Sequence, residues 1–183
     1  TTASLAVGRE PSFAASEEQE LLVREVRRFA EERIAPGTRQ RDRAHEFPTD
    51  VLREMGELGL LGMLVPEAYG GAGLDSLSYV LAVEEISRVC PSVGVTMSVT
   101  NSVCCWPIAR YGAEEVKRTV LRELATGECI GGFGLTEPTS GSDAASMRTL
   151  ARREGGEYVL DGEKAWITNA GVSKYYTVMA LTD

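Results

Sequence analysis

The sequence predicts an α+β fold in which an all-helical N-terminal domain precedes a partial antiparallel β-domain. Two observations support this prediction. Apolar residues recur at helical spacing through five segments that end near residue 127. Beyond Gly127 the pattern changes to short apolar runs interrupted by glycine, which is typical of strands. We therefore expect a helical domain over 1–127, with 1–15 extended or poorly ordered, and an incomplete β-domain over 128–183.

The first two helices have recognisable ends. Ser16-Glu-Glu-Gln19 is a capping-box pattern, in which both side chains satisfy backbone N–H groups at a helix start. Apolar residues follow it at helical spacing, and Pro36-Gly37 is expected to end that helix because proline interrupts the hydrogen-bond ladder. A second helix is predicted to begin at Pro48 and to close at Gly59.

Three further helices are expected over about 76–89, 89–109 and 113–125. The middle one is an uncharged run of membrane-span length. It contains Pro91, Pro107 and several polar residues, which would be costly in lipid. A helix that is apolar all round is otherwise a central buried helix, and that is the interpretation we adopt.

About five strands are expected after the helices. Residues 129–136 and 147–153 form the first two, and 175–181 form the last. Between them, 158–164 is predicted to be a hairpin with Asp161-Gly162 in a type I′ turn. These strands have few partners, so we expect that more polypeptide follows or that another chain covers them.

Composition excludes several classes of function. The net charge of −8, from 19 basic and 27 acidic residues, gives no electrostatic footprint for nucleic acid. The four cysteines lack CxxC spacing and the single histidine is far from them, so no metal site is expected. Adjacent Cys104 and Cys105 are expected to be buried small apolar groups. No secretory signal is visible.

Two segments carry the chemistry. In Gly134–Asp143, the hydroxyls of Thr136 and Ser142 and the N–H groups around Gly141 could bind anionic oxygens, although the same residue types also make ordinary surface turns. In the second segment, Trp166 and Thr168 are two apart, which predicts that both project from one face of a strand. That pair suits a flat, polar, anionic cofactor. A plain core position for Trp166 is the alternative.

Two carboxylate pairs are conceivable acid–base groups. Glu137 and Asp143 lie in the loop, and Glu84 and Glu85 lie on the third helix. Loop carboxylates usually accept backbone N–H bonds or remain solvated. We therefore expect structural roles for all four residues.

With these motifs in place, the chain resembles the N-terminal part of an acyl-CoA dehydrogenase, a flavoprotein family. The resemblance covers roughly 16–183 and includes several segments that occur in order at family-like spacing. The amino-acid sequence of 84–102 resembles the short-chain branch of the family in particular. The matching segments are 55–79, 84–102, 111–128, GLTEPTSGSDAAS at 134–146 and DGEKAWITNAG at 161–171.

The resemblance implies a three-domain subunit of which this chain supplies the first domain and about half of the second, without the C-terminal helical bundle. It implies that FAD is the cofactor. Thr136 would bond the isoalloxazine ring, Ser142 would reach a pyrophosphate oxygen or the substrate, and Thr168 would lie near flavin N5. Met97, with the rest of the segment 97–101, would border the acyl-chain pocket. The full set of implied flavin contacts is Phe133, Leu135, Thr136, Gly141, Ser142, Trp166, Ile167 and Thr168.

The implied reaction is α,β-desaturation of an acyl-CoA, of short chain, to the trans-2-enoyl-CoA in fatty-acid β-oxidation. Electrons would pass to electron-transfer flavoprotein. The family's catalytic glutamate lies in the C-terminal domain, so no catalytic residue is expected in this chain and the chain alone is expected to be inactive. A homotetramer in the bacterial cytoplasm, or alternatively the mitochondrial matrix, is implied for the full-length form. An acyl-CoA oxidase or flavin monooxygenase of the same fold, or a non-catalytic acyl-CoA-binding fragment, are the alternatives.

Overall fold

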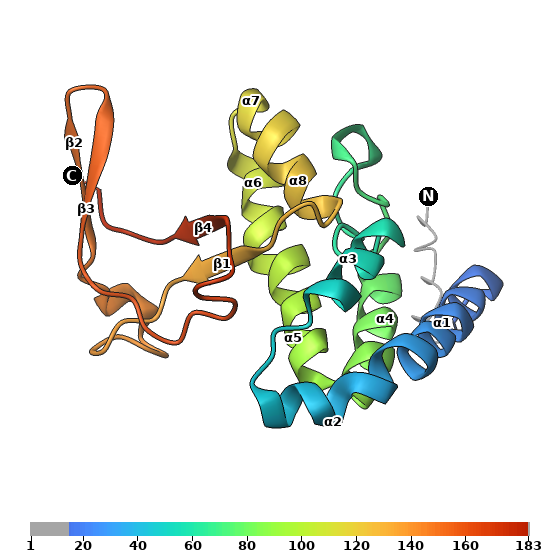
Figure 1. Cartoon of the computed structure of the whole chain (residues 1–183). Helices are drawn as coiled ribbons and strands as arrows, with labels where there is room; N and C mark the ends of the chain where they lie inside the picture. The colour runs from blue at the N-terminus through green and yellow to red at the C-terminus, as the bar shows by residue number, and fades with distance from the viewer. Residues whose placement is uncertain (1–14, 183) are drawn as a thin grey trace, which may run out of the picture.

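The computed structural model describes residues 15–182. Helices form one body and the strands extend from one side of it, so the two halves of the chain are also separate in space (Figure 1). The expected α+β class, with helices first and a small sheet region after them, is confirmed.

The first helix is longer than predicted. It comprises α1 (Glu17–Phe29), the π-helical turn η1 (Ala30–Ile34) and α2 (Ala35–Ala44), which continue one another. The capping box is confirmed, since Ser16 Oγ accepts from the Gln19 N–H at 3.2 Å and Gln19 Oε1 accepts from the Ser16 N–H at 3.0 Å. The prediction that Pro36-Gly37 ends the helix is wrong. The wider π turn shifts the ladder, so that Pro36 lies at the start of α2, where its missing N–H costs little.

The next helices match their predicted ends. Helix α3 (Thr49–Glu57) follows Pro48 and closes at Gly59, which has a φ of 75° that suits glycine. A 3₁₀ turn, η2 (Glu67–Tyr69), interrupts the loop that follows. Helix α4 (Ser76–Val89) is capped by the Asp75 carboxylate, which accepts from the Ser78 N–H at 2.7 Å.

The central uncharged helix is also confirmed. It consists of α5 (Pro91–Val99), the π turn η3 (Thr100–Cys105) and α6 (Trp106–Tyr111). Within residues 15–182, no helix is both long and apolar enough to cross a membrane. The fifth predicted helix is formed by α7 (Glu114–Val116), η4 (Lys117–Leu121) and α8 (Arg122–Ala125).

Two apolar cores hold these elements. The first lies among α1, α3, α4 and α5 and includes Ile34, Leu52, Met55, Ile86 and Met97. The second joins the helices to the strands, since Phe133 and Tyr175 pack against Cys104, Cys105 and Leu124. A Cβ on Gly131 would lie 2.9 Å from Leu124 Cδ2 and 3.1 Å from Cys104 Sγ, so glycine allows the first strand to approach the helices this closely.

The strands form two separate pairs in the part of the chain that the structure describes. Strand β1 (Gly131–Gly134) runs parallel to β4 (Tyr175–Val178), and β2 (Leu150–Glu154) runs antiparallel to β3 (Glu157–Asp161). The expectation of antiparallel pairing therefore holds for the second pair only. Residues 131–134 and 175–178 are far apart in sequence, and a long excursion between them lets the strands run in the same direction.

The hairpin turn lies elsewhere than predicted. Gly155 and Gly156 connect β2 to β3, and Gly155 has a φ of 65°. Asp161 instead ends β3, and Gly162 passes so close to Thr149 that a Cβ would lie 2.5 Å from its Oγ1. Residues 162–174 form loops and turns between β3 and β4, so the predicted strand around Trp166 does not exist.

Candidate cofactor site

The two segments identified from the sequence lie against each other. The Ala165 N–H donates to the Thr136 carbonyl at 2.8 Å, and Lys164 Nζ donates to the Leu135 carbonyl at 3.0 Å. The loop that follows β1 is therefore bonded to the segment that follows β3. Both backbones are held without using the side chains of Thr136 or Trp166.

A buried ion pair strengthens this contact. Lys164 Nζ lies 2.8 Å from Glu137 Oε1, and the two side chains are only 8% and 4% exposed. Glu137 also accepts from the Arg148 N–H at 2.6 Å, from the Thr149 N–H at 2.9 Å and from Thr149 Oγ1 at 2.6 Å. The bond from Lys164, and next that from the Thr149 hydroxyl, lower the pKa of Glu137 to about 2.

Glu137 is consequently a structural carboxylate rather than an acid or base. Glu85 has the same character, because Arg27 holds it with bonds of 2.6 and 2.9 Å and Arg88 adds one of 3.3 Å. The bonds from Arg27 lower the pKa of Glu85. The structural roles expected for these two glutamates are confirmed.

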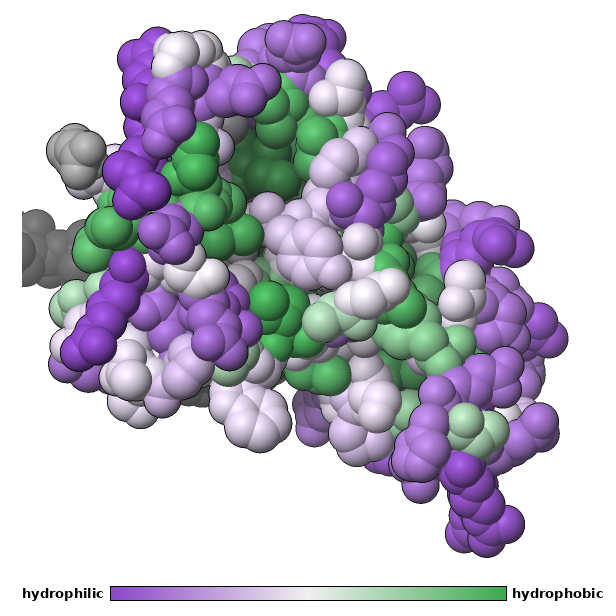
Figure 2. Space-filling view, turned by 60° about the vertical axis from the view of Figure 1, so that its left-hand side comes forward, coloured by the Kyte–Doolittle hydropathy of each residue, from purple (hydrophilic) through white to green (hydrophobic). Residues whose placement is uncertain are grey.

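A hollow of about 150 Å³ lies between the helices and the two bonded segments. Five of the eight predicted flavin contacts line it, together with Ala165 and two valines of the central helix. Figure 2 turns the strand side of the molecule forward and shows hydrophobic side chains gathered around a hollowed surface there. The residues that line the 150 Å³ hollow are Val99, Val103, Phe133, Leu135, Thr136, Ala165, Trp166 and Thr168.

Trp166 is the most unusual of these residues. Its side chain is 92% exposed, so it belongs to neither apolar core of the described residues. Its backbone has a φ of 57°, in the left-handed region that a bulky residue rarely adopts. Trp166 and Thr168 thus reach the hollow through a loop and turn rather than through strand alternation.

The other predicted residues lie outside the hollow. Gly141 and Ser142 occupy an exposed turn, where a Cβ on Gly141 would meet nothing within 4 Å. Ile167 is half-buried and points toward Gly134, whose Cβ would lie 3.7 Å from Ile167 Cδ1. Met97 is fully buried in the first core, so packing accounts for it.

Sequence reasoning missed three residues at this site, Val103, Ala165 and Asn169. Val103 forms the helical wall of the hollow with Val99, which lies in the segment expected to border the acyl-chain pocket, and Asn169 bonds the loop wall to the helices. Val103 and Ala165 carry no chemical signal in the sequence. Asn169 could have been suspected, because asparagine tolerates the left-handed backbone in which it occurs, at a φ of 68°.

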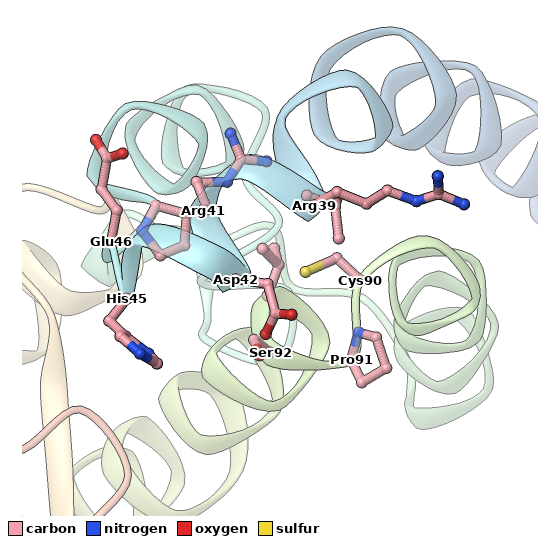
Figure 3. A pocket seen from close by; sticks show the side chains of 11 residues that line it. Arg39, Arg41, Asp42, His45, Glu46, Cys90, Pro91 and Ser92 are labelled. Atoms are coloured by element: carbon pink, nitrogen blue, oxygen red, sulfur yellow. The ribbon is translucent and has the colours of Figure 1, made fainter.

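A second, larger hollow of about 530 Å³ lies between α2 and the start of α5. Side chains of both charges surround it, including Arg39, Asp42, Glu46 and His45 (Figure 3). Arg41 also lines it but donates to the Ile34 carbonyl at 2.8 Å. None of the predicted site residues borders this hollow.

The cysteines add no reactive group. Cys104 and Cys105 are 1% and 0% exposed, as expected of small apolar core residues. Burial raises the pKa of Cys104 to about 12 and also raises that of Cys105. Over residues 15–182, no three His, Cys, Asp or Glu side chains gather where they could hold a metal ion.

The described residues thus form helices followed by a small sheet region, with a hollow at their junction that is lined by an aromatic residue and two threonines. Comparison with known proteins identifies the class of protein. Residues 16–128 match the model of the acyl-CoA dehydrogenase N-terminal domain, and 132–183 match that of the middle domain. The chain therefore belongs to the acyl-CoA dehydrogenase family.

Individual relatives agree with this membership. Human mitochondrial short-chain specific acyl-CoA dehydrogenase is 48% identical over 91% of this chain and 40% of that protein. A glutaryl-CoA dehydrogenase from Mycobacterium smegmatis, solved in complex with FADH2, has a TM-score of 0.88 and 39% identity, over 92% of this chain and 44% of that one. A chain in the structure described as the electron transferring flavoprotein of Acidaminococcus fermentans has a TM-score of 0.89 and 43% identity, over 94% and 46%. The chain thus spans less than half the length of these relatives.

Proposed function

We propose that the 150 Å³ hollow is one wall of an FAD site and that the protein desaturates acyl-CoA thioesters, of short chain, to trans-2-enoyl-CoA. The observation that carries this proposal is the meeting of five predicted flavin contacts, drawn from two distant segments, around one hollow. The relative solved with FADH2 supports the choice of cofactor.

The residues fit a flavin chemically. Trp166 offers an almost fully exposed aromatic face, on which a flat ring can stack. Thr136 and Thr168 are half-buried and both line the hollow. In the proposed complex their hydroxyls would donate to ring atoms, and the exposed turn at Gly141 and Ser142 would offer N–H and hydroxyl groups to phosphate oxygens.

The proposed chemistry divides between this chain and the rest of the protein. When bound, FAD accepts the β-hydride of the substrate. The residues described here bind and orient that cofactor, and the valine wall excludes water from one side of it. Glu85 and Glu137 are held in structural bonds and Glu84 lies exposed on α4, away from the hollow, so we assign the base that removes the α-proton to a glutamate outside this chain. On that assignment the 183-residue chain alone has no dehydrogenase activity.

Electron-transfer flavoprotein is the proposed acceptor, which the match to the Acidaminococcus structure supports. Relatives occur in bacteria and in mitochondria, so the bacterial cytoplasm remains a prediction, as does the homotetramer. An acyl-CoA oxidase of the same fold would pass electrons to oxygen instead. Comparing reoxidation of the substrate-reduced enzyme by electron-transfer flavoprotein and by oxygen separates the two, since the proposal requires the flavoprotein to be the faster acceptor.

FAD titration of the full-length protein, followed by flavin fluorescence, tests the site. Thr136→Val and Thr168→Val each remove one hydroxyl and keep the shape, and we expect each to weaken FAD binding by roughly tenfold, as for loss of one hydrogen bond. Thr119→Val is the matched control, because its hydroxyl donates within a helix to the Glu115 carbonyl at 2.8 Å. Equal FAD affinity in all four proteins would reject the assigned site.

A further inference from the structure

Asn169 connects three parts of the molecule through one side chain. Its Nδ2 donates to the Gly131 carbonyl on β1 at 3.0 Å, and its Oδ1 accepts from Thr96 Oγ1 on α5 at 3.1 Å. Its own carbonyl accepts from Ser173 Oγ at 2.8 Å and so closes the turn that contains it. The loop wall is thereby bonded to the first strand and to the central helix at a single residue.

These bonds lie beside the proposed flavin wall. Thr168, which lines the hollow, is the residue before Asn169, and Trp166 is three before it. On the opposite wall, Thr96 is three residues before Val99, so the two lie on one side of α5 about a turn apart. A bond between Thr96 and Asn169 therefore sets the distance between the helical wall and the loop wall.

The asparagine amide satisfies both partners at this position. The side chain must donate to one carbonyl and accept from one hydroxyl, which aspartate and leucine cannot do. The backbone φ of 68° also requires a residue that tolerates the left-handed region. Thr96 shares its proton between Asn169 and the Ser92 carbonyl at 3.0 Å, so the bond to Gly131 is the stronger of the two connections.

We propose that Asn169 is a positioning residue, which holds Trp166 and Thr168 at the spacing from α5 that flavin binding requires. The inference rests on the proposed function of the hollow. Asn169 does not line the hollow itself, so its effect on the flavin passes through its neighbours. Loss of its side chain should widen the hollow without removing any flavin contact.

Three variants of the flavin-loaded full-length protein test this role. Asn169→Gly keeps the backbone freedom and removes both side-chain bonds, Asn169→Asp keeps the shape and removes the donor, and Thr96→Val removes the helix bond alone. Tyr79→Phe is the matched control, since it deletes a bond of 3.0 Å to Ser98 Oγ between α4 and the central helix. The measurements are the FAD dissociation constant, the flavin absorption spectrum and the Tm of the flavin-free protein.

We expect both Asn169 variants to weaken FAD binding about tenfold and Thr96→Val to weaken it about threefold. We also expect a shifted flavin absorption band in these variants, while their Tm values fall no further than that of the control. Adding Thr96→Val to Asn169→Gly should cause no further loss, because the shared bond is already gone. If Asn169→Gly does not fold, Asn169→Asp and Thr96→Val are compared with the control in the same way, by FAD affinity, absorption spectrum and Tm.

Two results overturn the inference in distinguishable ways. If the unaltered full-length protein does not bind FAD, the proposed function and this inference fail together. If it binds FAD and the Asn169 and Thr96 variants bind equally well with an unchanged spectrum, the hollow remains a flavin site and only the positioning role is rejected. Weakened binding that merely parallels the fall in Tm also rejects it, because a purely structural role would give that pattern.

Discussion

Replacing Trp166 tests whether exposure and backbone strain at one residue mark a ligand contact. The residue is 92% exposed, with a φ of 57°. In the flavin-free protein its side chain gains little from packing, while its backbone occupies an unfavourable region. Trp166→Gly and Trp166→Ala both remove the ring, but only glycine relieves the backbone.

The magnitudes follow from these two properties. The left-handed region costs a non-glycine residue about 1–2 kcal/mol, a cost that glycine avoids. Glycine also has more freedom in the unfolded chain, which lowers the stability of the folded state by about 0.5–1 kcal/mol relative to alanine and offsets part of this gain. Trp166→Gly should therefore be more stable than Trp166→Ala by about 0.5–1 kcal/mol. Both should lie within about 1 kcal/mol of the unaltered protein, because a large loss of about 3–5 kcal/mol is expected only of a buried tryptophan.

Although the stability of these variants should change little, their FAD affinity should fall. An aromatic stacking contact is worth about 0.5–1.5 kcal/mol, which corresponds to a two- to tenfold weaker FAD affinity in both variants. Trp166→Phe keeps a ring and should retain most of the affinity. Urea unfolding of the flavin-free protein gives the first comparison and FAD titration gives the second.

Two outcomes would refute this reasoning. A loss of 3 kcal/mol or more in both variants would make Trp166 a packing residue despite its exposure. A glycine variant less stable than the alanine variant by about 0.5–1 kcal/mol would show that the backbone carries no strain, because the cost of glycine's freedom in the unfolded chain would then stand alone. Either result would remove the physical basis for reading this residue as a cofactor contact.

Two further predictions concern stability. Because its partners lower the pKa of Glu137 to about 2 from an ordinary value of 4.5, its stabilising contribution should be complete above pH 4.5 and lost as the pH falls toward 2. Urea unfolding across this window should show a steeper pH dependence in the unaltered protein than in Glu137→Gln, and equal slopes would contradict the assignment. Gly71→Ala would place a Cβ 2.0 Å from the Val65 carbonyl oxygen and should destabilise by about 1–3 kcal/mol in thermal unfolding. Gly141→Ala meets nothing within 4 Å, so a change beyond about 0.5 kcal/mol there would undermine the comparison.

The sequence predicted most of the helical half because its signals there are local. Ser16 with Gln19 and the run over 76–89 fix helix ends through side chains only a few residues apart. The prediction at Pro36 was wrong because the π turn η1 moves the proline to a tolerated position, and that turn depends on packing along the whole of α1, η1 and α2. A prediction made from the residues around Pro36 could not include this π turn, so it ended the helix too early.

The candidate site was predicted in its residues but not in its backbone. Strand alternation predicted that Trp166 and Thr168 face the same way, but there is no strand, and a left-handed residue and a turn bring both to the hollow. Val103 in the opposing wall was missed because apolar helix residues look alike in sequence, whatever they face. Which of them border a hollow depends on how the strands pack against the helix, a long-range property.

The parallel pairing of β1 with β4 has a consequence for the order of folding. The helices are built from contacts close in sequence and can form as the chain emerges, whereas residues 131–134 have no strand partner until 175–178 have been made. The bonds that join Thr136 to Ala165 and Glu137 to Lys164 need no residue beyond 165, so the two walls of the hollow can meet before β4 exists. A nascent chain that stops before residue 175 would therefore lack only the strand partner of β1, and addition of β4 would close the segment between the two strands.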